Sequence, residues 1–145
     1  MDTFELNPQL ARDCHRLGRL PFSELLLMDN AHYPWFILVP RTRETELYRL
    51  EPALQAGLMT EVNRIAAFID KHQPQIEKLN VAAIGNLVRQ LHVHVVGRHS
   101  ADPAWPGVVW GTASRTAYSR AALAALRASL NAARLPGFVA HPDSP

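Results

Sequence analysis

The sequence predicts an α+β protein with an antiparallel sheet, and three features carry that prediction. Short apolar runs come in pairs, one long amphipathic helix lies between the pairs, and no regular alternation of strand and helix is present, as a doubly wound sheet would need. The chain has 145 residues, is 48% hydrophobic and carries a formal net charge of only +2. These values favour one folded domain over a disordered chain.

The chain is expected to begin with a short helix. Asn7 followed by Pro8 is typical of an N-cap with proline at the first helical position, which predicts a helix from residue 8 to about 16 that ends near Gly18.

Two apolar runs then follow, from Ser23 to Met28 and from Trp35 to Val39, with Asp, Asn and Pro residues between them. The intervening residues favour a turn, so we expect an antiparallel strand pair that Pro40 closes.

The segment from Pro52 to about Lys71 is predicted to be the long helix. Its apolar residues recur at intervals of three and four and form one stripe, which consists of Leu54, Leu58, Val62, Ile65 and Ile69. Two further strands are expected at Lys78 to Ile84 and Leu91 to Val96, with Gly85 and Asn86 between them.

Near the C-terminus, Ser119 is a candidate N-cap for a helix whose leucines again repeat at three and four. The last eleven residues are expected to be an arm or a frayed end.

Composition also narrows the compartment and the partners. No run of about 18 apolar residues occurs and the N-terminus lacks the build of a signal peptide, so we expect neither membrane spanning nor export. Cys14 is the single cysteine, which excludes an intramolecular disulfide and fits the reducing cytoplasm. The arginines are scattered and form no basic tract, so no nucleic-acid partner is expected.

The most informative stretch is the second strand of the later pair. In an extended chain, Gln90, His92 and His94 point to one face, and the apolar residues between them point to the other. With a rise of roughly 3.3 Å per residue, the two imidazoles can reach one phosphate-sized group. One neutral ring can then act as nucleophile or base while its neighbour donates a proton.

From the histidine pair alone, two other interpretations stay open. The strand could present a solvated polar face with no chemistry, or the two imidazoles could ligate zinc or copper. A metal site would need further ligands, and no acidic residue lies at an obvious spacing within this strand.

The run from Gln90 to Arg98 resembles the signature strand of the histidine triad (HIT) superfamily of nucleotide hydrolases and transferases, whose motif is His-x-His-x-His followed by two apolar residues. The apolar strand from Trp35 to Arg41 and the long helix are similar to the family's preceding elements. The segment from Asp102 to Gly111 looks like a bacterial branch. The resemblance covers about residues 23–111 and implies a single HIT-like domain over residues 1–145, with a C-terminal helical extension from about 112.

The resemblance implies a catalytic role for two residues. His92 matches the family's nucleophile, which attacks the α-phosphorus of a nucleoside phosphate derivative and forms a nucleotidyl-histidine. His94 matches the histidine that hydrogen-bonds the phosphate oxygens. The resemblance also implies phosphate or ribose contacts, for which the matching residues are Asp29, Asn30, Asn80 and Asn86. No metal or other cofactor is required.

The sequence departs from the family's pattern at three positions. Gln90 replaces the first histidine of the triad, although its amide is expected to orient a neighbouring ring by hydrogen bonding. Trp35 stands where several branches have a further active-site histidine, and Leu87 replaces a hydroxyl residue that helps the leaving group in some members. His99 is the candidate to compensate, if its loop folds back.

Two tryptophans and two arginines are secondary candidates. Trp105 and Trp110 are expected to pack their loop onto the domain, with contact to the nucleotide base or to a second subunit as the alternative. Arg98 and Arg115 are candidates for distal phosphates, against a default of surface arginine.

The expected function is hydrolysis or transfer at the α-phosphate of a purine nucleoside phosphoramidate, dinucleoside polyphosphate or nucleotidyl conjugate. The alternative is a regulatory module that binds nucleotide with weak or no catalysis. The resemblance also implies a homodimer.

Overall fold

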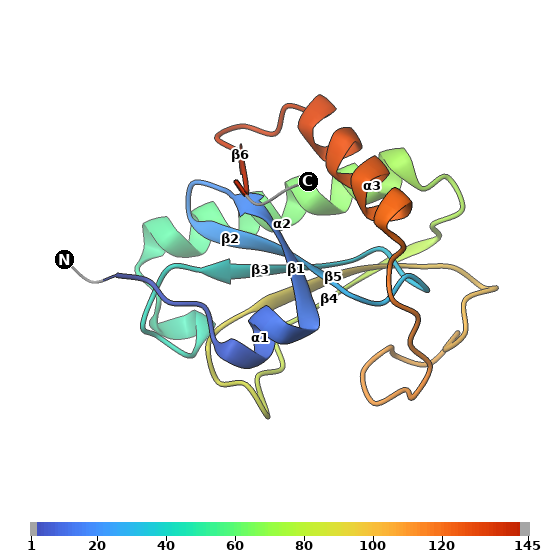
Figure 1. The fold of residues 1–145 in the computed structure, drawn as a ribbon. Coiled ribbons are helices and arrows are strands. Elements are labelled where there is room, and N and C mark those ends of the chain that lie inside the picture. Colours follow the sequence, from blue (N-terminus) through green and yellow to red (C-terminus); the bar gives the residue numbers. More distant parts are fainter. Residues whose placement is uncertain (1–2, 143–145) are drawn as a thin grey trace.

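The computed structural model describes residues 3–142, and within them one six-stranded antiparallel sheet has the strand order β4-β5-β3-β2-β1-β6 (Figure 1). The strands are β1 (Cys14–Arg19), β2 (Ser23–Met28), β3 (Trp35–Pro40), β4 (Lys78–Ala82), β5 (Val93–Arg98) and β6 (Val139–Ala140). The helices are α1 (Pro8–Asp13), α2 (Pro52–His72) and α3 (Arg120–Ala132), together with the 3-10 turn η1 (Leu47–Arg49). The α+β class and the antiparallel sheet are confirmed.

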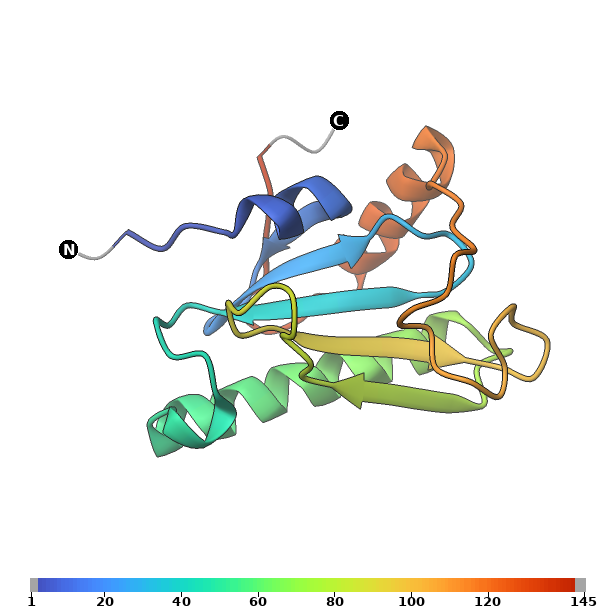
Figure 2. The same cartoon turned by 90° about the horizontal axis from the view of Figure 1, so that it is seen from below.

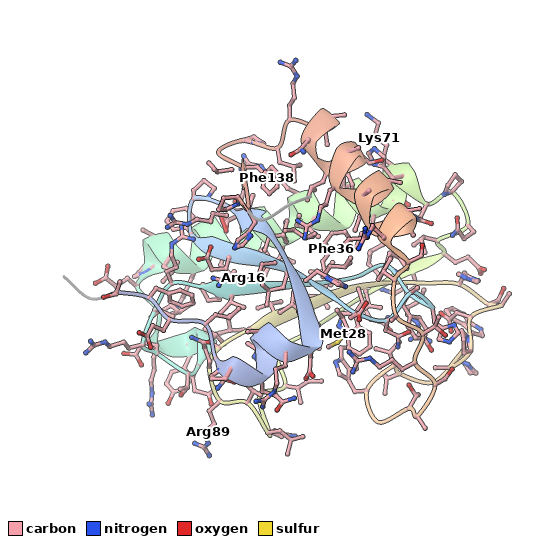
Figure 3. The ribbon with its side chains drawn as sticks, in the orientation of Figure 1. Arg16, Met28, Phe36, Lys71, Arg89 and Phe138 are labelled. Carbon is pink, nitrogen blue, oxygen red and sulfur yellow. The ribbon has the colours of Figure 1, made fainter. Side chains whose placement is uncertain are left out.

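The sheet separates two apolar cores. Helices α2 and α3 lie on one side of it and α1 lies on the other (Figure 1). The helix-side core joins α2 and α3 to the sheet through residues such as Ile65, Leu130 and Phe36, and Figure 3 shows Phe36 in that layer. The outer core joins α1 to the opposite face through residues such as Leu10 and Ile37. The two faces of the sheet therefore pack against different elements, one against α2 and α3 and the other against α1.

The long helix follows its predicted stripe. Leu58, Val62, Ile65 and Ile69 are all buried against the sheet, and Leu54 packs at the edge of the same core. Pro52 lies in the first turn of α2. Backbone N–H groups in the first turn have no acceptor within the helix, so the missing N–H of proline costs no helical hydrogen bond. Each such buried aliphatic side chain contributes roughly 1.5–3 kcal/mol relative to exposure. Figure 2 shows α2 running along the strands, where it packs mainly against β5.

The two central strands agree with the prediction closely. Ser23–Met28 and Trp35–Pro40 pair antiparallel with Leu25 opposite Leu38, and Pro40 is the last strand residue rather than the first residue after it. Strand β4 ends at Ala82, two residues earlier than expected.

Strand β5 is displaced by two residues toward the C-terminus and runs through Gly97 to Arg98. A Cβ at Gly97 would lie 2.8 Å from side-chain atoms of Ile69 and Pro34. The glycine therefore allows the strand to continue beneath α2, where a larger residue would collide.

The N-terminal helix prediction was too long, because the helix ends at Asp13 and Cys14–Arg19 forms strand β1. This strand pairs with β2 and buries Leu17 in the helix-side core, so a tertiary pairing overrides the local helical pattern. The expected C-terminal arm was also partly wrong. Val139–Ala140 forms β6 and pairs with Gly18 and Arg19 of β1.

The C-terminal helix agrees with the prediction. Ser119 caps α3 by accepting a hydrogen bond from the Ala122 N–H at 3.1 Å. Across residues 3–142, no helix is both long enough and apolar enough to cross a bilayer.

Candidate active site

His92 and His94 lie on the sheet face that carries α1. Their ring centroids are 4.9 Å apart, and both residues are buried, with exposed fractions of 6% for His92 and 5% for His94. The alternating residues Leu91, Val93 and Val95 pack into the helix-side core instead. The strand period of two thus separates apolar side chains from imidazoles.

The ring of His92 is held by the backbone of the segment that leads into β5. Its Nδ1 lies 2.6 Å from the backbone carbonyl oxygen of Gln90. A carbonyl oxygen only accepts hydrogen bonds, so Nδ1 carries the proton and donates it. In the neutral ring, Nε2 then keeps its lone pair and is available as a nucleophile.

The ring of His94 has the opposite tautomer. The indole N–H of Trp35 donates to Nδ1 of His94 at 2.9 Å, and an indole N–H can only donate. The proton of the neutral ring therefore sits on Nε2. Burial, helped by the nearby His92, lowers the pKa of His94 to about 3, so this ring stays neutral across the physiological range.

The two imidazoles line a cavity of about 550 Å³, here called the histidine cavity. One ring brings an unprotonated nitrogen to this site and the other brings an N–H group. The remaining walls come from four parts of the chain: α1, the ends of β2 and β3, residues 84–88, and residues 109–115. Most of the wall is apolar, with Asn30, Asn86 and Arg115 among the polar residues.

Two of the residues predicted for phosphate or ribose binding line this cavity. Asn30 is 5% exposed, and its side chain is fixed from both ends: Nδ2 donates to the Ser114 carbonyl and Oδ1 accepts the His32 N–H. Asn86 lies on the loop between β4 and β5 and is exposed. Both residues therefore border the cavity, Asn30 with its amide already hydrogen-bonded at both ends and Asn86 with its side chain exposed.

Asp29, the neighbour of Asn30, does not line the histidine cavity. Its carboxylate accepts hydrogen bonds from the Tyr118 N–H and lies 2.9 Å from Nε2 of His15. Burial alone would raise the pKa of Asp29, but those two partners outweigh it and hold the pKa below its usual value. In this structure Asp29 fixes the segment that follows residue 114, rather than facing the two catalytic candidates.

Asn80 and His99 are not brought to the imidazole pair. The Asn80 Oδ1 accepts a hydrogen bond from the Arg98 guanidinium at 2.8 Å. His99 lines a separate cavity of about 410 Å³ beside α2 and α3. The structure therefore does not show the fold-back that would bring His99 to the imidazole pair.

Gln90 acts on His92 through its backbone and not through its side chain. Its side-chain amide is hydrogen-bonded to the N-terminal segment: Oε1 accepts from the Asn7 N–H, and Nε2 donates to the Glu5 carbonyl. The expectation that this amide orients a neighbouring ring is corrected, because the carbonyl of the same residue does so.

The loop after β5 is fastened by a buried ion pair. Arg98 is 2% exposed and donates to both carboxylate oxygens of Asp102, at 2.8 and 3.0 Å, and to the Gly107 carbonyl at 2.8 Å. Burial would raise the pKa of Asp102, yet hydrogen bonds led by the Arg98 guanidinium lower it. Arg98 is thus committed to the loop and is not placed to meet a distal phosphate.

The same loop brings an indole and a guanidinium to the histidine cavity. The Trp110 ring centroid lies 5.3 Å from that of His94 and 6.1 Å from that of Trp35. Arg115 lines the cavity and donates to the Asp29 carbonyl at 3.0 Å. The ring centroid of Trp105 instead lies 5.9 Å from the Arg98 guanidinium carbon.

Helix α1 lines the cavity through Leu10 and Asp13, which the sequence did not predict. No spacing signal could have found them, because about 80 residues separate α1 from the histidines.

Beside α1, burial raises the pKa of the Cys14 thiol to about 12, which leaves it a poor nucleophile at neutral pH. Among residues 3–142, no three His, Cys, Asp or Glu side chains converge as metal ligands would.

A sequence model described as the HIT domain matches residues 9–101. A histidine triad protein from Bradyrhizobium japonicum is 37% identical with a TM-score of 0.86, and the match covers 90% of this chain and 98% of that one.

Two further structures are similar. A histidine triad protein from Sinorhizobium meliloti is 39% identical and one from Marinobacter aquaeolei is 38% identical. Each has a TM-score of 0.86, and each match covers 90% of this chain and 96% of the other. No curated protein matches the chain.

Proposed function

This chain belongs to the HIT domain family, and from that premise we propose that it hydrolyses or transfers nucleotides at the α-phosphate through a covalent histidine intermediate. The proposed substrates are purine nucleoside phosphoramidates, dinucleoside polyphosphates or nucleotidyl conjugates. The observation that carries the proposal is the pair of opposite tautomers on His92 and His94, at the wall of one cavity.

In the first step, the Nε2 lone pair of His92 attacks the α-phosphorus and an N–P bond forms. The bond to the leaving group breaks, and the leaving group takes the electron pair. An amine leaving group also takes a proton from water as it departs. The ring becomes a cation, and the Gln90 carbonyl, which accepts from Nδ1, stabilises that charge. His94 donates Nε2–H to a phosphoryl oxygen as negative charge grows there.

In the second step, water or another acceptor attacks the same phosphorus and the N–P bond breaks. The electron pair returns to Nε2 of His92, and the acceptor's proton is released to solvent. The neutral ring is thereby restored for a further turnover, with its Nδ1 still bonded to Gln90.

The walls of the cavity fit the remaining parts of a nucleotide. Apolar side chains such as Leu10, Ile37 and Val109 suit a purine base, whereas Asn30 and Asn86 offer amides to ribose or phosphate. Arg115 supplies positive charge near the phosphate. Buried ligand surface of this mixed kind is typical of small-molecule sites.

The test is a substrate panel applied to the wild-type chain and to His92→Ala, together with calorimetry using AMP. We expect turnover of adenosine phosphoramidate by the wild type, none by the variant, and AMP binding by both. Equal turnover by the two proteins would refute the role of His92.

A regulatory module that binds nucleotides is the second candidate. The observation in its favour is that the side chain of Gln90, at the position of the first triad histidine, bonds the N-terminal segment and leaves the rings with one partner fewer. AMP binding without turnover across the whole panel would support this function instead.

We also propose that the chain forms a homodimer through the free edge of β4 and the outer side of α2. Strand β4 is an edge strand, and exposed apolar residues lie on or near it and on α2, including Val81 at 49% and Met59 at 56% exposed. Light scattering should give twice the chain mass of 16.2 kDa. A Val81→Glu variant should shift that mass toward the monomer, and a wild-type monomer would contradict the proposal.

A further inference from the structure

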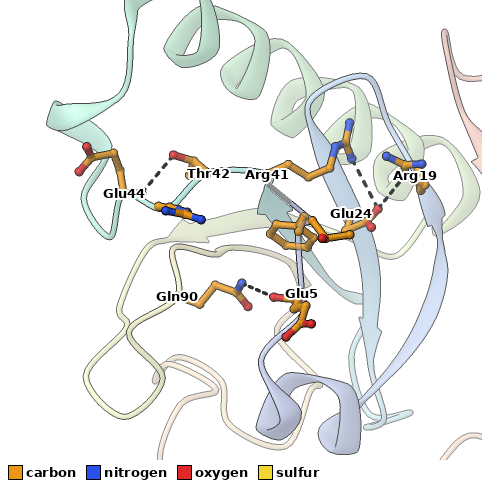
Figure 4. Close-up of a pocket in the computed structure, with 10 residues that line it drawn as sticks. Glu5, Arg19, Glu24, Arg41, Thr42, Glu44 and Gln90 are labelled. Carbon is orange, nitrogen blue, oxygen red and sulfur yellow. Dashed lines mark hydrogen bonds and ion pairs between the residues drawn. The ribbon is translucent and has the colours of Figure 1, made fainter. Parts of the chain in front are cut away.

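Gln90 holds the N-terminal segment, residues 3–7, with both ends of its side-chain amide. Oε1 accepts the backbone N–H of Asn7 at 2.8 Å, and Nε2 donates to the backbone carbonyl of Glu5 at 2.9 Å. Figure 4 shows the bond to Glu5 at the wall of a charged cavity of about 770 Å³, which this segment and Gln90 both line. Gln90 therefore pairs with the segment as one residue of a neighbouring strand would.

The bond pattern explains why an amide suits this position. A side-chain amide presents its acceptor and its donor side by side, which matches a backbone N–H and a carbonyl two residues apart. The two nitrogens of an imidazole point in divergent directions, so a histidine here could not make both bonds. The replacement of the first triad histidine is thus accompanied by a contact that histidine could not form.

The segment that Gln90 holds leads directly into a wall of the histidine cavity. Asn7 is the N-cap of α1, and its Oδ1 accepts the Gln9 N–H at 2.8 Å. Helix α1 then contributes Leu10, which is 4% exposed, and Asp13 to the cavity. The Asp13 carbonyl also accepts the N–H of Asp29, next to the cavity-lining Asn30. The start of this wall is fixed by Gln90 and its end by the turn after β2.

The side chain and the carbonyl of Gln90 act on different parts of the site. The carbonyl fixes the ring of His92, and it belongs to the backbone, so substitution of the side chain leaves it in place. The side chain fixes α1. The two contributions are separable by mutation.

We infer that Gln90 is a positioning residue whose side chain holds α1 against the nucleotide site, and so controls nucleotide affinity rather than the rate of the chemical step. The ligand in this inference rests on the proposed function. The clamp, meaning the two hydrogen bonds from the Gln90 side chain to residues 5 and 7, does not depend on the proposed function.

The first experiment is hydrogen exchange on the full chain without nucleotide. In Gln90→Ala, we expect the amides of Asn7 and of the first turn of α1 to exchange about tenfold faster or more, because two hydrogen bonds are lost. Gln90→Glu keeps the acceptor for Asn7 and loses the donor to Glu5, so its effect should be intermediate. Gln75→Ala is the matched control, because that amide bonds Gln73 after α2 and should leave α1 unchanged. Unchanged exchange in Gln90→Ala would overturn the inference.

The second experiment separates affinity from chemistry. For Gln90→Ala, the Kd for AMP and the KM for adenosine phosphoramidate should rise about three- to tenfold, while kcat changes less than about twofold. A kcat lowered about 100-fold at unchanged KM would overturn the inference, because it would place Gln90 in the chemical step. If the wild-type chain bound no AMP, the proposed function would fail, and the exchange comparison would still decide the clamp.

Discussion

The indole N–H of Trp35 donates to Nδ1 of His94 across the pair of strands β3 and β5, at 2.9 Å. The bond fixes which nitrogen of His94 carries the proton, because indole has no acceptor to offer. Trp35 therefore sets the tautomer of the neighbouring His94 ring. Trp35 is itself buried and lies against Tyr33 and Trp110, which limits its rotation.

The first prediction concerns this bond. Trp35→Phe keeps an aromatic ring and removes the donor, so Nδ1 of His94 loses its partner and the two tautomers become closer in free energy. Loss of a bond of about 1 kcal/mol should lower kcat/KM about five- to tenfold. Imidazole ¹⁵N chemical shifts report the tautomer directly. A single Nε2–H tautomer in the variant would show that Trp35 does not set it.

The segment that carries the histidine pair could be predicted from sequence because its side chains alternate with period two. That period is a local property, and it places Leu91 and Val93 in one core and His92 and His94 opposite. The long helix was predictable for the same reason, from Leu58 and its repeats.

The rest of the site depends on contacts between distant residues, which no local pattern encodes. The hydrogen bond between Gln90 and Asn7 joins residues 83 positions apart in the sequence, and the one between Asn30 and Ser114 joins residues 84 positions apart. Asn80 is of the residue type expected for a phosphate contact, yet its side-chain oxygen accepts a hydrogen bond from the buried guanidinium of Arg98. Residue type and spacing thus indicated the imidazole pair, and the resemblance to the HIT family indicated His92 as the nucleophile candidate. Tertiary packing decided which polar neighbours face it.

The second prediction separates the roles of the two histidines. His92→Ala should lower turnover at least about 10⁴-fold, since the nucleophile is lost. His94→Asn should lower it about 10²–10³-fold, the usual effect of removing one donor to a developing oxyanion. Mass spectrometry of acid-quenched reactions should find a nucleotidyl adduct on the wild type and none on His92→Ala. An adduct retained by His92→Ala would assign the nucleophile elsewhere.

The third prediction follows from the pKa of His94. Folding lowers that pKa from 6.5 to about 3, mainly by burial, so between these values the unfolded chain binds more protons than the folded one. Stability from this group is therefore full above about pH 6.5 and is lost as the pH falls, by up to about 1.4 kcal/mol per pH unit.

The measurement is urea unfolding at about pH 5 and about pH 7 for the wild type and His94→Asn. The asparagine keeps an oxygen near the Trp35 indole and removes the titration, so its free energy of unfolding should fall less on acidification. Carboxylates such as Asp29 contribute equally to both proteins and cancel in the comparison. Equal losses would mean that His94 is not held neutral by the fold.

The fourth prediction concerns the loop that carries Trp110 and Arg115 to the histidine cavity. The Arg98 and Asp102 side chains are 2% and 0% exposed, so Asp102→Ala leaves a buried guanidinium without its carboxylate. Such a change costs about 3–5 kcal/mol of unfolding free energy. Arg19→Ala is the matched control, because its side chain is 61% exposed, its contact with Glu24 is 3.5 Å long, and an exposed pair is worth about 0–1 kcal/mol. Since the loop forms part of the cavity wall, Asp102→Ala should also weaken AMP binding under conditions where the variant remains folded. A loss no larger than that of Arg19→Ala would show that Asn80 and the Gly107 carbonyl satisfy the buried guanidinium without the carboxylate.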